Sequence, residues 1–123
     1  LCHDGDRLVM SDGTDRLTFR DPDTFEPIGE QFVRLRGQPL HRLNELECVD
    51  GAVYANVWEE DFLVRIDPET GRVADYIDAS GLLQGDDLIG SEVLNGIAYD
   101  PTAETFYITG KWWPKMFEVR FVE

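Results

Sequence analysis

The sequence has few basic residues, few cysteines and histidines, and no long run of apolar residues. Only 11 of its 123 residues are Lys or Arg, against 25 Asp or Glu, which gives a formal net charge of −14. A surface this acidic repels polyanions, and affinity for nucleic acid rests largely on cationic contacts to phosphate. The apolar runs are far shorter than the roughly 20 residues that a membrane-spanning helix needs. We therefore expect neither nucleic acid nor a membrane as a partner.

Cysteine and histidine are also too scarce to indicate a metal centre. The two cysteines, Cys2 and Cys48, form no Cys-x-x-Cys pair, and His3 and His41 have no neighbour at metal-ligand spacing. We expect neither a metal nor another cofactor. The first residues, LCHDGDRLVM, lack the basic start and the apolar stretch of a signal peptide.

The composition is that of a soluble globular protein, with 42% hydrophobic and 29% charged residues. The length allows one compact domain but not two. Much of the acidity lies in stretches such as SDGTD, RDPDT and IDPET, where Asp and Pro favour turns. Between the turns, apolar residues recur with a period of two, which predicts β-strands at RLVMSD, RLTFRD, AVYANVW, FLVRID, RVADYID, TFYITGK and MFEVRFV.

The chain repeats itself at an interval of 46 residues. This offset aligns Cys2 with Cys48, Leu8 with Tyr54, Asp21 with Asp67 and Pro22 with Pro68. A third copy begins where Leu94 and Asn95 repeat Leu43 and Asn44 after 51 residues, because the loop around SGLLQGDDLIGSE adds length. Periods of roughly 40 to 50 residues are typical of propellers and solenoids.

One repeat holds four predicted strands, which is the content of a propeller blade. In the best-defined unit they are NELECVDG, AVYANVW, FLVRIDPETG and RVADYIDA. We predict an all-β chain of β-propeller blades: one over residues 1–42, a second over 43–93, and a three-stranded, incomplete one over 94–123. Because a propeller closes with roughly four to eight blades, we expect a C-terminal portion of a longer protein, or else self-association through exposed blade edges.

Several motifs together resemble the C-terminal half of the glutamine cyclotransferases, the glutaminyl-peptide cyclotransferase family of plants and bacteria. They are RLVMSDGT, LNELECVDGAVYANVW, RIDPETGRV, DASGLL, VLNGIAYD and FYITGKWWPKMFEV, and they cover essentially the whole chain. The resemblance implies a five-bladed β-propeller that converts the N-terminal glutaminyl residue of a peptide to pyroglutamate with release of ammonia. It also favours a secreted or periplasmic protein, as many relatives are.

The resemblance further implies that proton transfer is carried out by a Glu in a Gly-Leu-Glu type segment, which these 123 residues do not contain. We therefore expect the full-length protein to be an active acyltransferase and this chain alone to be inactive. Two alternatives remain open. One is a non-catalytic propeller fragment that binds peptides or serves assembly, and the other is a lactonase-like propeller enzyme that holds a metal in its channel.

By resemblance, three residues lie around the substrate: Asn44 in LNELE, Trp58 in NVW and Lys111 in TGKWWP. Asn44 would hydrogen-bond polar groups of the substrate, Trp58 would form a wall of the glutamine pocket, and Lys111 would supply a charged donor. Each also has a purely structural interpretation. Asn44 can form a turn, Trp58 can pack blade against blade, and Lys111 can extend over the neighbouring tryptophans.

Glu45, Glu47, Asn95 and Trp113 are weaker candidates for the same site. Glu45 and Glu47 lie on a predicted inner strand, so a carboxylate would point toward the channel, either as a second proton relay or simply solvated. Asn95 repeats Asn44 in the next blade. Trp113 belongs either to an aromatic rim suited to a peptide or to the core.

The two cysteines occupy equivalent positions on neighbouring predicted inner strands. Inner strands converge near the propeller axis, so a disulfide between Cys2 and Cys48 is one interpretation. Buried free thiols are the other, because a free cysteine behaves as a small hydrophobic residue.

Overall fold

A computed structural model of the chain describes residues 1–122, and nearly all of its regular structure is antiparallel β-sheet. The helical structure within these residues is a single 3-10 turn, η1 (Gly85–Leu88), in the long loop before the third repeat. No helix in residues 1–122 is long and apolar enough to cross a membrane. The predicted all-β class is therefore confirmed.

Three sheets follow one another along the chain, and each is a simple up-and-down meander. Sheet 1 contains β1 (Cys2–Asp4), β2 (Arg7–Ser11), β3 (Arg16–Arg20) and β4 (Pro27–Phe32). Sheet 2 contains β7 (Leu43–Val49), β8 (Ala52–Val57), β9 (Phe62–Ile66) and β10 (Val73–Asp78). Sheet 3 contains β11 (Leu94–Asp100), β12 (Thr105–Gly110) and β13 (Phe117–Val119), and a small ribbon of β5 (Arg34–Leu35) and β6 (Gln38–Pro39) joins sheets 1 and 2.

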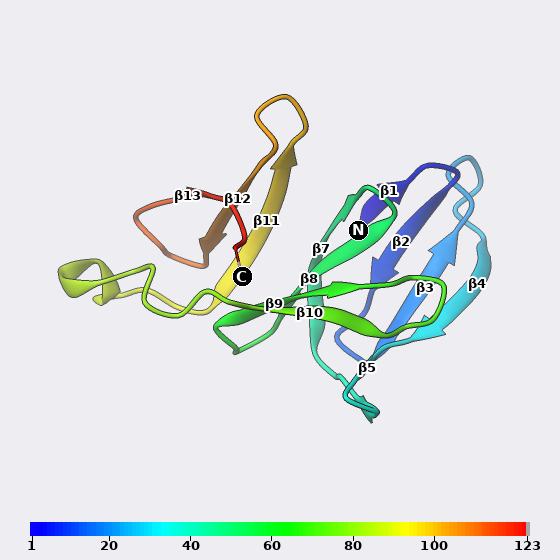
Figure 1. The fold of residues 1–123 in the computed structure, drawn as a ribbon, viewed down its shortest axis with the longest axis horizontal. Coiled ribbons are helices and arrows are strands. Elements are labelled where there is room, and N and C mark those ends of the chain that lie inside the picture. The colour runs from blue at the N-terminus through cyan, green and yellow to red at the C-terminus, as the bar shows by residue number, and fades with distance from the viewer. Residues whose placement is uncertain (123) are drawn as a thin grey trace.

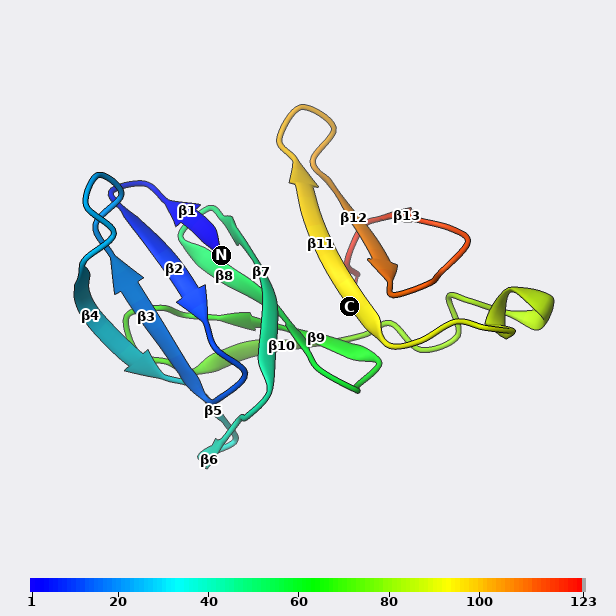
Figure 2. The ribbon, with the colours of Figure 1, turned by 180° about the vertical axis from the view of Figure 1, so that it is seen from behind.

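The first strands of the three sheets lie side by side (Figure 1). The middle one, β7, contacts β1 on one side and β11 on the other, and β7 and β11 run in the same direction (Figure 2). We call β1, β7 and β11 the inner strands. The later strands of each sheet fan outward from them, as the strands of successive propeller blades do.

The middle strands of sheet 2, β8 and β9, are buried on both faces, which explains why their sequences are largely apolar. Against sheet 1 they pack Val53 and Val64, both fully buried, in one hydrophobic cluster with Val9. Against sheet 3 they pack Leu63, in a second cluster with Ile108. Because neighbouring residues of β9 point to opposite faces, FLVRI places an apolar side chain in each interface.

The strand registers correct part of the sequence repeat. In the first hairpin Cys2 pairs with Val9, whereas in the second Cys48 pairs with Val53. Between the cysteine and the two-residue turn, the first hairpin has one more residue pair than the second, so the offset of 46 residues does not hold within this hairpin. The alignment of Leu8 with Tyr54 is therefore wrong, although the cysteines themselves correspond.

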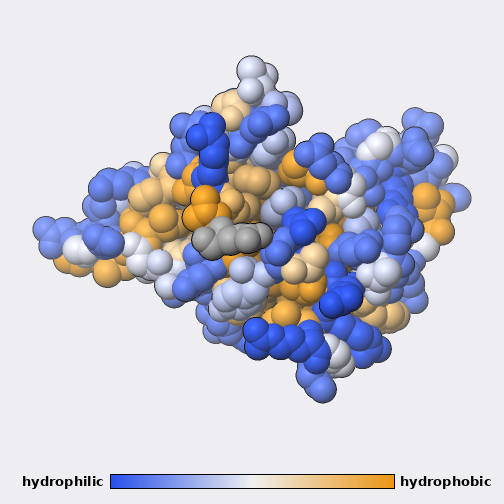
Figure 3. Space-filling model, viewed as in Figure 1, coloured by the Kyte–Doolittle hydropathy of each residue, from blue (hydrophilic) through white to orange (hydrophobic). Residues whose placement is uncertain are grey.

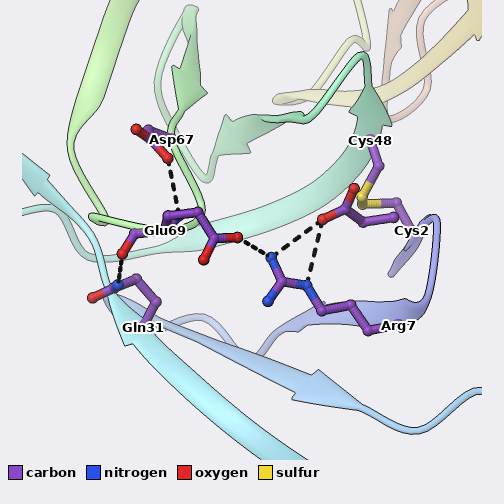
Figure 4. Close-up of polar contacts among 7 residues, drawn as sticks. Cys2, Arg7, Gln31, Cys48, Asp67 and Glu69 are labelled. Atoms are coloured by element: carbon purple, nitrogen blue, oxygen red, sulfur yellow. Dashed lines mark hydrogen bonds and ion pairs between the residues drawn. A yellow bond between two sulfur atoms is a disulfide. The ribbon is translucent and has the colours of Figure 1, made fainter.

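Sheets 1 and 2 are joined covalently near the inner strands and by polar contacts further out (Figure 4). A disulfide links Cys2 of β1 to Cys48 of β7, whose Cα atoms are 5.5 Å apart. The Arg7 guanidinium pairs with Glu69 at 2.8 Å, and the Gln31 side-chain amide donates to the Glu69 carbonyl oxygen at 2.9 Å. These contacts hold the turn after β9 against sheet 1.

In the same turn, Gly71 has no room for a side chain. A Cβ atom at this position would lie 1.9 Å from the carbonyl oxygen of Phe32, and φ is +74°. The Gly71 carbonyl oxygen also accepts a 2.9 Å hydrogen bond from the Arg34 backbone N–H. We expect Gly71→Ala to lower the free energy of unfolding by about 3 kcal/mol, because it combines a steric overlap with a strained φ.

Urea unfolding followed by circular dichroism measures this loss. Gly51→Ala is the matched control, since Gly51 has φ of +79° but no heavy atom within 4 Å of the added Cβ. The control should lose only about 1 kcal/mol, the usual cost of a left-handed backbone for a residue with a side chain. Equal losses in the two variants would show that the close approach to Phe32 does not constrain the turn.

Candidate functional site

The residues singled out by resemblance gather at one end of the sheets. We call it the site end, defined as the end at which the inner strands β7 and β11 begin and the strands β8 and β12 finish. Because β7 and β11 run in the same direction (Figure 2), their first residues lie at the same end. Asn44 and Asn95 belong to the starts of these strands, and Trp58 and Lys111 directly follow β8 and β12.

Asn44 and Asn95 occupy equivalent irregularities. In sheet 2 the pairing of β7 with β8 shifts between Leu43 and Leu46, and in sheet 3 the pairing of β11 with β12 shifts between Leu94 and Ile97. A bulge of this kind breaks the ladder locally and redirects a side chain, and such bulges are frequent beside functional sites. Each asparagine is half-buried at the start of its bulge.

Trp58 and Lys111 are held by the same backbone contact in successive sheets. The Trp58 N–H donates to the Arg42 carbonyl oxygen at 2.8 Å, and the Lys111 N–H donates to the Val93 carbonyl oxygen at 2.9 Å. Each acceptor lies two residues before the bulge asparagine. Trp58 therefore has the same position relative to Asn44 as Lys111 has relative to Asn95. Trp58 is 46% exposed.

The Lys111 ammonium pairs with Glu92 at 3.3 Å, and both side chains are about half exposed or more. An ion pair this exposed adds little stability, because water and salt screen it. Cation-π contacts within residues 1–122 involve arginines, so the predicted alternative of Lys111 over the neighbouring tryptophans has no such contact. The ammonium is therefore exposed beside Glu92, and its role as a charged donor to a ligand stays a prediction.

Trp113 has structural contacts, whereas its neighbour Trp112 is exposed. The Trp113 indole N–H donates to the Glu92 carbonyl oxygen at 2.9 Å, and its ring meets Phe117 edge-on at 6.2 Å. A Cβ on Gly110 would lie 2.2 Å from the Trp113 ring, so the glycine makes room for it. Trp112 is 72% exposed and is the better candidate for an aromatic rim.

The turn after β2 in sheet 1 packs against the start of β7. The Ser11 hydroxyl donates to the carbonyl oxygen of Asn44, and the Leu43 N–H donates to the Thr14 carbonyl oxygen at 3.3 Å. Asp12 closes this turn by accepting from Thr14 and Arg16. The Thr14 hydroxyl bond, followed by the Arg16 contact, lowers the pKa of Asp12 against the opposing effect of burial.

Sequence reasoning missed Asn56, which lies two residues before Trp58. Its side chain is fully buried, and its Oδ1 accepts a 3.1 Å hydrogen bond from the Gly96 N–H in the bulge of β11. The Asn56 Nδ2 and the Asn95 Oδ1 are both buried without a partner in the described part of the chain. The only signal in the sequence is an amide side chain within the apolar stretch AVYANVW.

Glu47 has a different environment from either of the two predicted for it. Its Oε2 accepts from the Tyr99 N–H of β11 at 3.0 Å, and its Oε1 accepts from the Cys48 N–H at 3.1 Å. Both carboxylate oxygens are thus bonded to backbone, one of them across the interface between sheets 2 and 3. Glu45 is exposed. Neither geometry adds a proton relay to the site end.

Two hollows in the described residues lie away from the site end. One, of about 650 Å3, runs between β9–β10 and the last described residues, and includes Tyr54, Tyr76 and Phe121. The other, also about 650 Å3, lies between the β5–β6 ribbon and β10. On the face of the molecule seen in Figure 3, hydrophobic residues gather around sheet 3. Asn44, Trp58 and Lys111 line neither hollow.

Comparison with known proteins gives consistent results. The family model described as glutamine cyclotransferase matches residues 1–121. The glutaminyl-peptide cyclotransferase of Arabidopsis thaliana is 39% identical over 125 residues, which cover 98% of this chain. The crystal structure of Myxococcus xanthus glutaminyl cyclase matches with a TM-score of 0.86 and 44% identity over 99% of this chain.

The likeness extends over nearly all of this chain but over only part of each relative. The chain spans 38% of the Arabidopsis protein and 55% of the M. xanthus chain. The shared fold confirms the predicted propeller-type architecture, while the number of blades stays a prediction.

Proposed function

This chain belongs to the glutamine cyclotransferase family, and on that premise we propose that the protein converts the N-terminal glutaminyl residue of peptides to pyroglutamate and releases ammonia. The observation that carries the proposal is the common position of Asn44, Trp58 and Lys111 at the site end, on two neighbouring sheets. The two relatives named above, one a glutaminyl-peptide cyclotransferase and one a glutaminyl cyclase, support it.

The reaction is an intramolecular acyl transfer. The neutral α-amine of the substrate attacks its own γ-carboxamide carbon, so a C–N bond forms, the bond to the amide nitrogen breaks, and a proton moves from the amine to the departing ammonia. Catalysis requires a donor for the negative charge that develops on the carbonyl oxygen. It also requires an acid/base group for the proton and a surface that holds the flexible side chain in its cyclic conformation.

The residues at the site end can supply two of these functions. In our proposal the exposed Lys111 ammonium stabilises the developing oxyanion, and the half-exposed Trp58 ring forms the wall against which the glutamine side chain folds. Asn44 hydrogen-bonds the polar groups of the substrate from its bulge. Trp112 extends the aromatic surface toward the rest of the peptide.

Proton transfer is the function that these residues do not supply. Glu47, which sequence reasoning named as a relay candidate, has both carboxylate oxygens bonded to backbone N–H groups. We propose that the acid/base group, a Glu by family resemblance, comes from a part of the protein outside the 123 residues. The site would then be completed where that part meets the site end.

Ammonia release provides the test. The intact protein should release ammonia from a peptide that begins with Gln, because this peptide has both a free α-amine and a γ-carboxamide. It should not act on a Glu-initiated peptide, which lacks the carboxamide, or on a peptide with internal Gln, which lacks a free amine at that residue. The isolated 123-residue chain should release none. Binding of the Gln-initiated peptide to the intact protein without ammonia release would instead favour a peptide-binding module, and ammonia release by the isolated chain would contradict our placement of the acid/base group.

A further inference from the structure

Two side-chain hydrogen bonds join sheets 2 and 3 within residues 1–122. One connects the Tyr99 N–H to Glu47, midway along the inner strands. The other connects the Gly96 N–H to Asn56 and lies at the site end. This second bond runs between the strand that leads into Trp58 and the bulge that contains Asn95.

The backbone of the bulge in β11 is narrowly constrained. Gly96 has φ of +132°, and a Cβ there would lie 2.9 Å from the Thr109 Cγ2 atom. The register shift leaves the Gly96 N–H outside the ladder with β12, and the Asn56 Oδ1 accepts it. The bulge that contains Asn95 is therefore held from the neighbouring sheet as well as by the paired residues that flank it in its own sheet.

Asn56 is poorly explained as a purely structural residue. Its strand neighbours Ala55 and Val57 are apolar and essentially fully buried. Burial of an amide is costly unless its polar atoms are bonded, and the Nδ2 has no partner in the described residues. Native proteins leave few buried polar atoms unsatisfied, and the exceptions concentrate at functional sites.

We propose that Asn56 is a positioning residue for the reaction: through its hydrogen bond to Gly96 it fixes sheet 3, with Asn95 and Lys111, relative to sheet 2, with Asn44 and Trp58. This inference rests on the proposed function. The geometric reason is that the candidate residues come from two sheets joined along the chain only by the long loop over residues 79–93, so their relative position depends on contacts across the interface. A misplacement of about 1 Å can lower a rate by about 100-fold.

The test compares Asn56→Leu with Gln31→Leu in the intact protein. Both remove a side-chain amide that bonds the backbone of a neighbouring sheet, but Gln31 lies on β4 and bonds Glu69 in the turn after β9, away from the site end. Asn56→Leu should lower kcat/KM for ammonia release by about 30- to 100-fold, mostly in kcat. Gln31→Leu should stay within about twofold, as expected of a distant, independent position.

A third variant separates positioning from loss of packing. Asn56→Asp keeps an oxygen that can accept from Gly96, so it should restore kcat/KM to within about fivefold of the original protein if that bond is what matters. Hydrogen exchange at the Gly96 amide reports the bond without any assay of activity. Protection should fall in Asn56→Leu and persist in Asn56→Asp.

Each outcome supports or overturns the proposal. Equal activity in the two leucine variants would overturn it, and so would an Asn56→Asp variant that keeps Gly96 protected but falls about 30-fold or more below the original protein in kcat/KM. The second comparison uses only Asn56→Asp and the original protein, so it applies even if the leucine variant does not fold. If the original protein releases no ammonia, the proposed function fails, and so does positioning for this reaction. If ammonia is released but Gly96 protection is unchanged in Asn56→Leu, the hydrogen bond is refuted and the positioning proposal is overturned, while the proposed function stands.

Discussion

Replacing Lys111 with methionine in the intact protein should lower kcat/KM for ammonia release by about 100-fold or more, because removal of one donor to a developing oxyanion costs about 10²- to 10³-fold. The fold should tolerate the change. The Lys111 ammonium contacts only Glu92 among the ion pairs of residues 1–122, and that pair is exposed. Initial rates of ammonia release, measured with a coupled assay over a range of peptide concentrations, give kcat and KM separately.

Lys115→Met is a matched control for this substitution. Lys115 lies in the same loop between β12 and β13, is similarly exposed, and pairs with Asp87. Its replacement should leave kcat/KM within about twofold, since exposed positions away from the site have small, independent effects. Similar losses in the two variants would point to the net charge of the loop, and full activity of the Lys111 variant would remove Lys111 from the site.

Asn44→Ala should also lower kcat/KM, but through KM more than through kcat. If Asn44 hydrogen-bonds the substrate in both the ground and transition states, its loss should raise KM more than it lowers kcat. The bulge itself should persist, because its backbone is held by Ser11 through the Asn44 carbonyl oxygen and not through the side chain. The split between kcat and KM thus separates a binding role for Asn44 from the charge-stabilising role of Lys111.

Loss of the Cys2–Cys48 disulfide should lower the free energy of unfolding by about 4 kcal/mol. The two residues are 46 apart in sequence. In the chain-entropy account, closing a loop of this length restricts the unfolded chain by about that amount. The double variant Cys2→Ser/Cys48→Ser, unfolded in urea and compared with the original protein, measures the difference.

A reducing agent provides the control for this experiment. Dithiothreitol should lower the urea midpoint of the original protein toward that of the double variant and should not change the double variant itself. A midpoint that does not respond, together with two titratable thiols in the unfolded protein, would mean that the cysteines are not bonded. Because structural disulfides persist in oxidising environments, we expect the native compartment to be an oxidising one.

The sequence predicted the strands well where at least one face of a strand is buried. Alternation in RLTFR corresponds to β3, the apolar run in FLVRI corresponds to β9, and the DP turns fall between strands as expected. The residues of strand β4, PIGEQF, were not identified within the predicted four-stranded blade, because nearly all of them are exposed and no apolar period is imposed on an edge strand. The ribbon of β5 and β6 was missed for the same reason.

The candidate site also contains residues that the sequence could identify and contacts that it could not. Asn44, Trp58 and Lys111 could be named from motifs that each span a few residues, because a resemblance to a family is visible in local sequence. Their functional roles stay predictions. The interface role of Glu47 could not be foreseen, because its partner is a backbone N–H of Tyr99, 52 residues further along the chain.

By itself, then, the sequence determined the strands that pack, the turns between them, the repeat and the family. The tertiary structure alone decided that Cys2 meets Cys48, that the two hairpins differ by a residue pair, that Asn44 and Asn95 lie in matching bulges, and that Asn56 holds the second of these. The physical reason is the range of the forces involved. Backbone preference and apolar period act between neighbours in sequence, whereas a bulge or a buried amide is fixed by the sheet packed against it.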